Sequence, residues 1–157
     1  MRLIQQGIDF LVDTLESHLG YYIDRVQTRY PDGTALDESI TIYKSFLHPD
    51  KMVENLPNIC VLGSRVEIEN FLSPQQTRAI EVMIVITVQD TDEEALTKKM
   101  YRYSEAVTDC IYNRYQLGDK VDFCRVDSVE LDTDNFEYGD TKYIKQALIE
   151  ATINQTE

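Results

Sequence analysis

The chain has 157 residues, of which 43% are hydrophobic and 27% are charged, which suits one compact domain and excludes a disordered chain. Its 28 acidic and 15 basic side chains give a formal net charge of −13. A negative charge of this size repels phosphate backbones and anionic lipid, which argues against ordinary nucleic-acid binding and membrane attachment. We therefore expect residues 1–157 to form a single soluble domain.

The first predicted element is a long amphipathic helix over residues 3–29. The helix is expected to end at Tyr30-Pro31-Asp32-Gly33, because proline cannot continue a helical ladder. A short strand is expected at 40–46, within a stretch (34–57) that otherwise carries no clear pattern. The helix is predicted from apolar residues that recur at three- and four-residue steps and so share one stripe: Ile4, Ile8, Leu11, Leu15, Leu19, Tyr22 and Val26.

Two strands are predicted next. Residues 59–69 predict a strand that bends at Gly63, since an isolated glycine in a strand often marks a bulge. Residues 79–89 give the clearest strand signal, because Ile80, Val82, Ile84, Ile86 and Val88 alternate strictly with their neighbours.

A second, central helix is predicted over residues 92–115, opened by a capping box of Thr91 and Glu94. Its buried stripe is expected to end with the aliphatic stem of Arg114. Strands at 121–131 and 143–153 then close the chain. This order predicts an α+β fold, with a mostly antiparallel β-sheet packed against the long N-terminal helix and the central helix.

No pattern in the sequence indicates catalysis or metal binding. The only histidines, His18 and His48, do not stand beside a nucleophile, and the six glycines form no phosphate-binding loop. The acidic runs that begin at Asp90 and Asp132 lack the glycine of a calcium loop at the sixth position. We therefore expect no enzymatic activity, no cofactor and no metal.

The cysteines and the amino terminus predict folding in a reducing cytoplasm. Cys60, Cys110 and Cys124 have no CxxC spacing, and each lies in an apolar run, as buried free thiols do. The terminus shows no signal-peptide pattern, and no segment is apolar enough to span a membrane.

Two groups of residues are candidates for contacts with other molecules. Acidic residues gather in the segment between the last two predicted strands, where Asp132, Asp134, Glu137 and Asp140 predict either a channel or docking surface or a solvated loop. Tyr101 and Tyr112 fall outside the buried stripe of the second helix, so they are candidate subunit-interface residues.

The order of the elements resembles one family of virion proteins. After the long helix come Leu-Pro-Asn-Ile-Cys-Val-Leu-Gly-Ser at 56–64 and the alternating strand at 80–88, which runs through Asp90 into the second helix. Tyr-Gln-Leu-Gly at 115–118 then precedes two closing strands. Over nearly the whole chain, this layout resembles the tail terminator proteins of tailed bacteriophages, also called tail completion or tail-to-head joining proteins.

The resemblance implies a structural virion protein that is made in the host bacterial cytoplasm and lies at the head-proximal end of the tail. Its copies would form a ring, of six subunits in this family, that caps the tail tube protein, ends tube polymerisation and docks a head-completion or neck protein. DNA would pass through the ring without specific binding. Self-association is expected through an exposed strand edge and contacts beside the second helix.

Two alternatives to a tail terminator stay open at this point. One is a different head–tail joining protein, such as a neck or head-completion protein, which would share the non-enzymatic role. The other is a cytosolic adaptor or inhibitor whose acidic surface imitates nucleic acid.

Replacing Asp132, Asp134 and Asp140 by Asn and Glu137 by Gln tests the acidic segment. If the segment lines a channel, the variant should fold normally and slow DNA ejection, because fewer charges repel the passing backbone. If it meets a basic partner, the variant should weaken docking, and added salt should reduce the difference. Particles that assemble and eject DNA as the parent does would leave the segment as a solvated loop.

Overall fold

The structure, a computed structural model, describes residues 3–45, 55–131, 136–138 and 142–156. In chain order its elements are α1 (Leu3–Arg29), β1 (Thr41–Tyr43), β2 (Asn58–Glu69), β3 (Thr77–Asp90), α3 (Glu93–Asn113), β4 (Phe123–Glu130), β5 (Phe136–Tyr138) and β6 (Lys142–Thr156).

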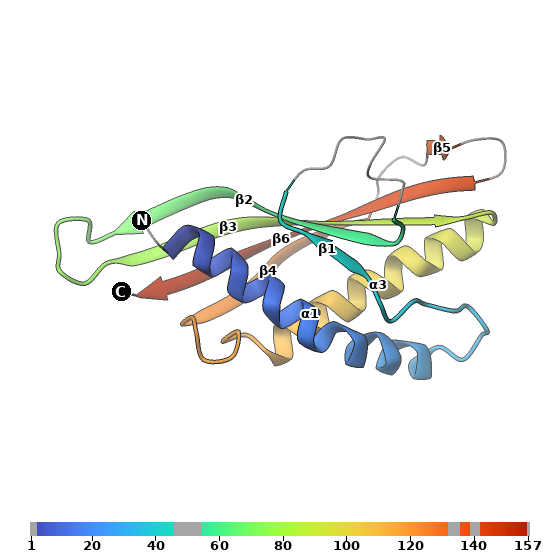
Figure 1. The fold of residues 1–157 in the computed structure, drawn as a ribbon, viewed down its shortest axis with the longest axis horizontal. Coiled ribbons are helices and arrows are strands. Elements are labelled where there is room, and N and C mark those ends of the chain that lie inside the picture. The colour runs from blue at the N-terminus through green and yellow to red at the C-terminus, as the bar shows by residue number, and fades with distance from the viewer. Residues whose placement is uncertain (1–2, 46–54, 132–135, 139–141, 157) are drawn as a thin grey trace.

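All the strands belong to one sheet, ordered β1-β2-β3-β6-β4, with β5 also pairing with β6. Every pairing is antiparallel except that of β1 with β2. Helices α1 and α3 lie side by side on one face of the sheet (Figure 1). The predicted α+β class, with a mostly antiparallel sheet packed against a long N-terminal helix and a central helix, is confirmed.

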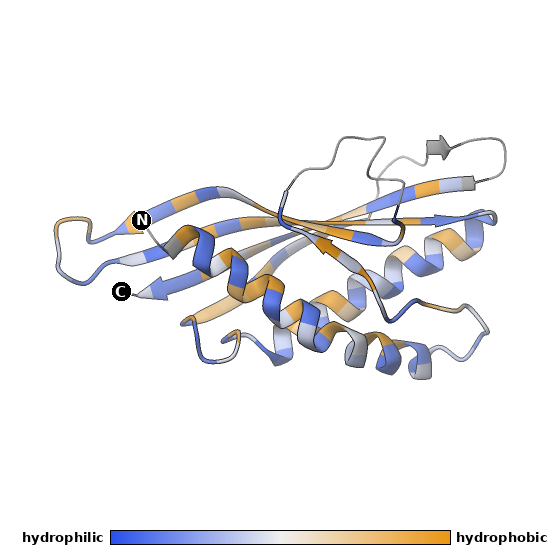
Figure 2. Cartoon of the chain, viewed as in Figure 1, coloured by the Kyte–Doolittle hydropathy of each residue, from blue (hydrophilic) through white to orange (hydrophobic). Residues whose placement is uncertain are grey.

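The core lies between this face of the sheet and the two helices. The alternating apolar residues predicted on β3 are all buried there, and the predicted stripe of α1 is buried from Leu11 to Val26. Along β3 and the helices, apolar and polar positions alternate as this burial requires (Figure 2). A period of two on the strand and of about 3.6 on the helices therefore places both apolar faces against each other.

The first turns of α1 come so close to the sheet that a side chain at position 7 would force its neighbours on the sheet to shift. A Cβ atom there would stand 2.9 Å from Cδ1 of Ile80 and 3.2 Å from Oε1 of Gln155. This close packing explains why glycine stands at position 7 of a helix in spite of its low helix propensity.

Several boundaries differ from those predicted. The capping box of Thr91 and Glu94 is wrong: Asp92 caps α3, and its carboxylate accepts a hydrogen bond from the N–H of Ala95 at 3.2 Å. An aspartate at this position also interacts favourably with the positive end of the helix dipole. Arg114 is exposed as the C-cap and does not continue the buried stripe.

Two of the predicted strands also differ in length from those observed. β1 is only three residues long, because it pairs with β2 over Asn58–Cys60 alone. β6 extends to Thr156, beyond the predicted end at 153, because it pairs with β3 along that strand's whole length. The predicted bend of β2 is confirmed by a shift of register between Gly63 and Arg65.

A polar clasp joins the end of α1 to α3. Asp32, just after α1, accepts two hydrogen bonds from the guanidinium of Arg102, at 2.8 and 2.5 Å, and Lys98 lies 3.7 Å from the same carboxylate. The guanidinium also lies over the ring of Tyr30, 4.9 Å from its centroid. These interactions compensate for the burial of Arg102, which would otherwise be costly for a charged group.

The clasp predicts an acid-sensitive part of the stability. Hydrogen bonding from Arg102 holds the pKa of Asp32 well below its usual value. The stabilisation is therefore present above pH ~4 and is lost as the pH falls through the lowered pKa. Asp32→Asn should lower the thermal midpoint at pH 7, and its difference from the parent should shrink at acid pH.

Asp24→Asn is the matched control for this experiment, because it removes the same charge from an exposed position on α1. Thermal unfolding followed by circular dichroism between pH 7 and pH 2 measures both variants. An Asp32→Asn midpoint equal to that of Asp24→Asn at every pH would contradict the role of the clasp.

Candidate functional site

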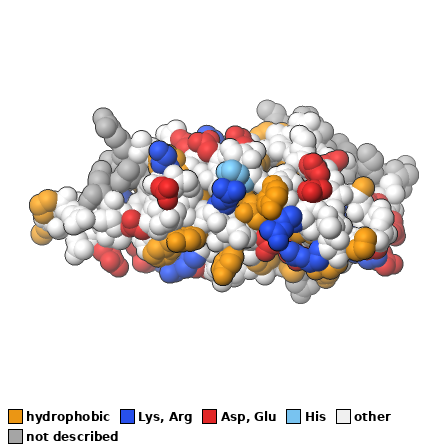
Figure 3. All heavy atoms as spheres, turned by 90° about the horizontal axis from the view of Figure 1, so that it is seen from below, with side chains coloured by type: hydrophobic (Ala, Val, Ile, Leu, Met, Phe, Trp, Pro, Cys, Tyr) orange, Lys and Arg blue, Asp and Glu red, His pale blue; other side chains and the backbone are white. Residues whose placement is uncertain are grey.

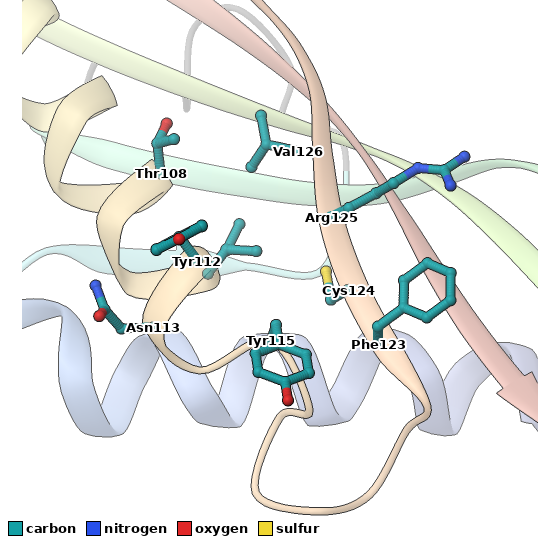
Figure 4. A pocket seen from close by; sticks show the side chains of 9 residues that line it. Thr108, Tyr112, Asn113, Tyr115, Phe123, Cys124, Arg125 and Val126 are labelled. Carbon is teal, nitrogen blue, oxygen red and sulfur yellow. The ribbon is translucent and has the colours of Figure 1, made fainter.

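The candidate site is an apolar groove at the surface between the last turns of α3 and the edge strand β4, with a volume of about 710 Å³ (Figure 4). Among its lining residues only Arg125 is charged. We call this feature the α3–β4 groove, and define it by the residues that line it: Thr108, Ile111, Tyr112, Asn113, Tyr115, Phe123, Cys124, Arg125 and Val126.

The turn after α3 shapes one end of the groove. The chain reverses through Leu117 and Gly118, which have φ angles of 49° and 74°, and the side chain of Leu117 is buried in the core. The chain then returns beside the helix end, where the N–H of Cys124 donates a hydrogen bond to the carbonyl of Tyr115 at 2.5 Å. This bond fixes the first part of β4 next to the tyrosine.

The outer edge of β4 is interrupted farther along. Its register with β6 shifts between Val126 and Ser128, so Asp127 stands at a bulge. The carboxylate of Asp127 accepts hydrogen bonds from Nε of Arg125 at 2.8 Å and from Oγ1 of Thr152 at 2.5 Å. Bulges and charges on an edge strand hinder the addition of a further strand. Contacts here would therefore be made by the groove side chains more readily than by strand pairing.

Two tyrosines give the groove its exposed apolar surface. The side chain of Tyr112 is 79% exposed and that of Tyr115 is 51% exposed, while Val126 and Cys124 point from β4 toward the helix (Figure 4). Exposed aromatic rings around a concave surface are typical of protein interfaces, where tyrosine is enriched.

The predicted interface residues Tyr101 and Tyr112 are both exposed, and only Tyr112 lines the groove. Eleven residues correspond to about three helical turns, so both tyrosines lie on one face of α3, roughly 17 Å apart. Tyr101 therefore extends the exposed aromatic surface along the helix without being part of the groove.

The predicted acidic site is not tested by the structure. Asp132, Asp134 and Asp140 lie outside the described residues, as does His48. Glu137 is in β5, whose backbone alone is described. The other histidine, His18, is half-buried on α1.

The groove offers no activated nucleophile. Burial raises the pKa of the Cys124 thiol to about 12, and the hydroxyl of Thr108 donates to the carbonyl of Ser104 at 2.7 Å. Within the described part of the chain, no group of three or more His, Cys, Asp or Glu side chains is arranged to hold a metal ion. None of the described helices is long and apolar enough to cross a membrane.

Sequence reasoning missed Tyr115, Phe123 and Val126 as members of the groove. Tyr115 follows the end of α3, and the side of a strand on which Phe123 projects depends on the register of β4 with β6. The spacing of Tyr112 and Tyr115 could have indicated this part of the groove. Residues three apart lie near each other on a helix surface, and these two stay close although α3 ends at Asn113.

Scans against protein-family models and against curated proteins found no match to this chain. The resemblance to tail terminator proteins therefore rests on the order of the elements, and the role of the groove has to be argued from its own residues.

The burial of Cys110 and Cys124 predicts that their thiols are alkylated slowly in the folded protein. Burial raises the pKa of both Cys110 and Cys124 to about 12, so at pH 8 roughly one thiol in ten thousand is ionised. Iodoacetamide should leave both unmodified in the native protein and should alkylate them in denaturant, as measured by mass spectrometry. Alkylation of either residue at equal rates in both states would contradict this prediction.

Proposed function

We propose that this chain is a structural subunit of a phage particle, one copy of a ring that caps the tail tube and provides the docking surface for the head or neck. The observation that carries the proposal is the α3–β4 groove, a preformed apolar surface that is rimmed by exposed tyrosines. Such a surface fits a protein partner better than a small substrate, because half or more of each tyrosine side chain at its rim is open to solvent.

The chemistry of the groove supports a binding role. Its one charged side chain, Arg125, is bound by Asp127, and its cysteine has a pKa far above neutral. A surface of this kind contributes shape and buried apolar area to an assembly.

The net charge of −13 supports controlled assembly. Copies that carry this charge repel one another until a specific contact outweighs the repulsion, and salt screens that repulsion. Free subunits would therefore stay apart in the cytoplasm and join at the tail tube, where one partner is already in place.

A ring of such subunits would end polymerisation of the tail tube because its two faces differ in shape. A ring that binds the tube end with one face and presents a different second face leaves no site for the next ring of tube protein. The second face is then free to bind a head-completion or neck protein.

Self-association should rise with ionic strength. Between about 0.01 M and about 1 M salt the screening length falls from roughly 30 Å to roughly 3 Å, which removes most of the repulsion between copies. Multi-angle light scattering should find monomers at low salt and larger closed species at high salt and high protein concentration. Monomers alone under all these conditions, with and without tail tubes, would contradict the proposal.

Capping can be measured on tubes. Tail tube protein that is polymerised with the purified chain present should form shorter tubes with a ring at one end in electron micrographs. Tyr112→Ser, which removes an exposed groove ring, should restore longer tubes, whereas Tyr21→Ser, which changes another exposed tyrosine, on α1, should not. Tube lengths unaffected by the parent chain would contradict the capping role.

A further inference from the structure

The hairpin formed by β2 and β3 ends in an exposed apolar tip. Its side chains Phe71 and Leu72 are 69% and 95% exposed, the latter among the most open large apolar side chains described. The hairpin extends beyond the helices, so the tip stands at one end of the molecule (Figure 1). We define the hairpin tip as residues 70–76, between the last paired residues of the two strands.

The tip is closed by its own hydrogen bonds. The N–H of Ser73 donates to the carbonyl of Asn70 at 2.8 Å, and Nε2 of Gln76 donates to the carbonyl of Phe71 at 2.7 Å. Asn70 has a φ of 57°, which asparagine tolerates better than most residues. A partner that binds the tip would therefore lose little conformational entropy on ordering it.

The hairpin tip and the α3–β4 groove both carry little charge, although the chain is strongly acidic. Residues 70–77 contain no charged side chain, and Arg125 is the only charged residue that lines the groove. On the helix-covered side, apolar side chains stand at the far left end, where the tip lies, and others lie over the body among acidic and basic side chains (Figure 3). Two copies that each carry −13 can meet here with little like-charge repulsion.

The one charged side chain that lines the groove, Arg125, is paired with Asp127 at 2.8 Å, and the tip carries no charged side chain. Neither surface therefore opposes the other by charge. The groove, with a volume of about 710 Å³, has room for apolar side chains from a partner.

We propose that the hairpin tip of one copy inserts Phe71 and Leu72 into the α3–β4 groove of the next copy. This inference rests on the proposed ring function and identifies the contact that builds the ring. The occupant is a second copy because the chain carries both an apolar projection and an apolar recess, each compatible in charge with the other.

Such a contact is directional. The tip and the groove are different surfaces, so each copy uses its tip toward one neighbour and its groove toward the other. Contacts of this head-to-tail type generate a ring when the rotation closes and a filament when it does not, whereas a symmetric dimer would use one surface twice.

Cross-linking between two variants tests this contact. One copy carries Leu72→Cys at the tip, and a second, tagged copy carries Tyr112→Cys at the groove rim. The native cysteines Cys60, Cys110 and Cys124 are buried and do not compete. Under mild oxidation at high salt, the mixture should form a disulfide-linked heterodimer at least about tenfold faster than Leu72→Cys mixed with Tyr21→Cys, as expected of a site with raised effective concentration.

A second measurement uses no cysteine. Phe71→Ser combined with Leu72→Ser should weaken self-association at least about 30-fold, the usual effect of losing hot-spot side chains. Both positions are exposed, so circular dichroism should show an unchanged fold.

The outcomes separate this inference from the proposed function. Cross-linking no faster than the Tyr21→Cys control overturns the inference, and rings that form in that case leave the ring function standing. Fast cross-linking in a chain whose parent forms no rings and shortens no tubes supports the tip–groove contact and contradicts the ring function. Unchanged self-association of the double serine variant also overturns the inference.

Discussion

The fold depends on covering one apolar face of the sheet. The alternating residues of β3 and their neighbours on β6 would meet water if α1 and α3 did not pack over them, and burial of this face is the main favourable term. The close approach at Gly7 and the clasp between Asp32 and Arg102 both serve this packing. The groove arises at its margin, where α3 ends beside the edge strand β4 and its last tyrosines are only partly covered.

In the proposed ring, the charge of the chain limits where other copies could bind. A body that carries −13 resists contact over most of its surface, so the few neutral apolar regions become the places where association costs least. The groove and the hairpin tip are such regions. The tip joins β2 and β3, whereas the groove lies between α3 and β4. In the proposed ring, directional assembly follows from the shape of a single subunit.

Sequence patterns predicted the features that repeat along an element. Both helices and the alternation in β3 follow from local periodicity, and the bend of β2 follows from a single glycine, which is why their positions were correct to within a few residues. The N-cap at Asp92 and the exposure of Arg114 depend on where a helix ends, which periodicity does not fix. The groove depends on the register of β4 with β6, a long-range pairing, so the sequence indicated Tyr112 and missed Phe123.

One mixing experiment tests directional assembly most directly. A tip-defective copy, Phe71→Ser with Leu72→Ser, keeps its groove, and a groove-defective copy, Tyr112→Ser with Tyr115→Ser, keeps its tip. Each should be monomeric alone, and native mass spectrometry of the mixture at high ionic strength should find heterodimers and nothing larger, because one intact contact is left per pair. A mixture that stays monomeric, or that forms full rings, would contradict head-to-tail assembly through the tip and the groove.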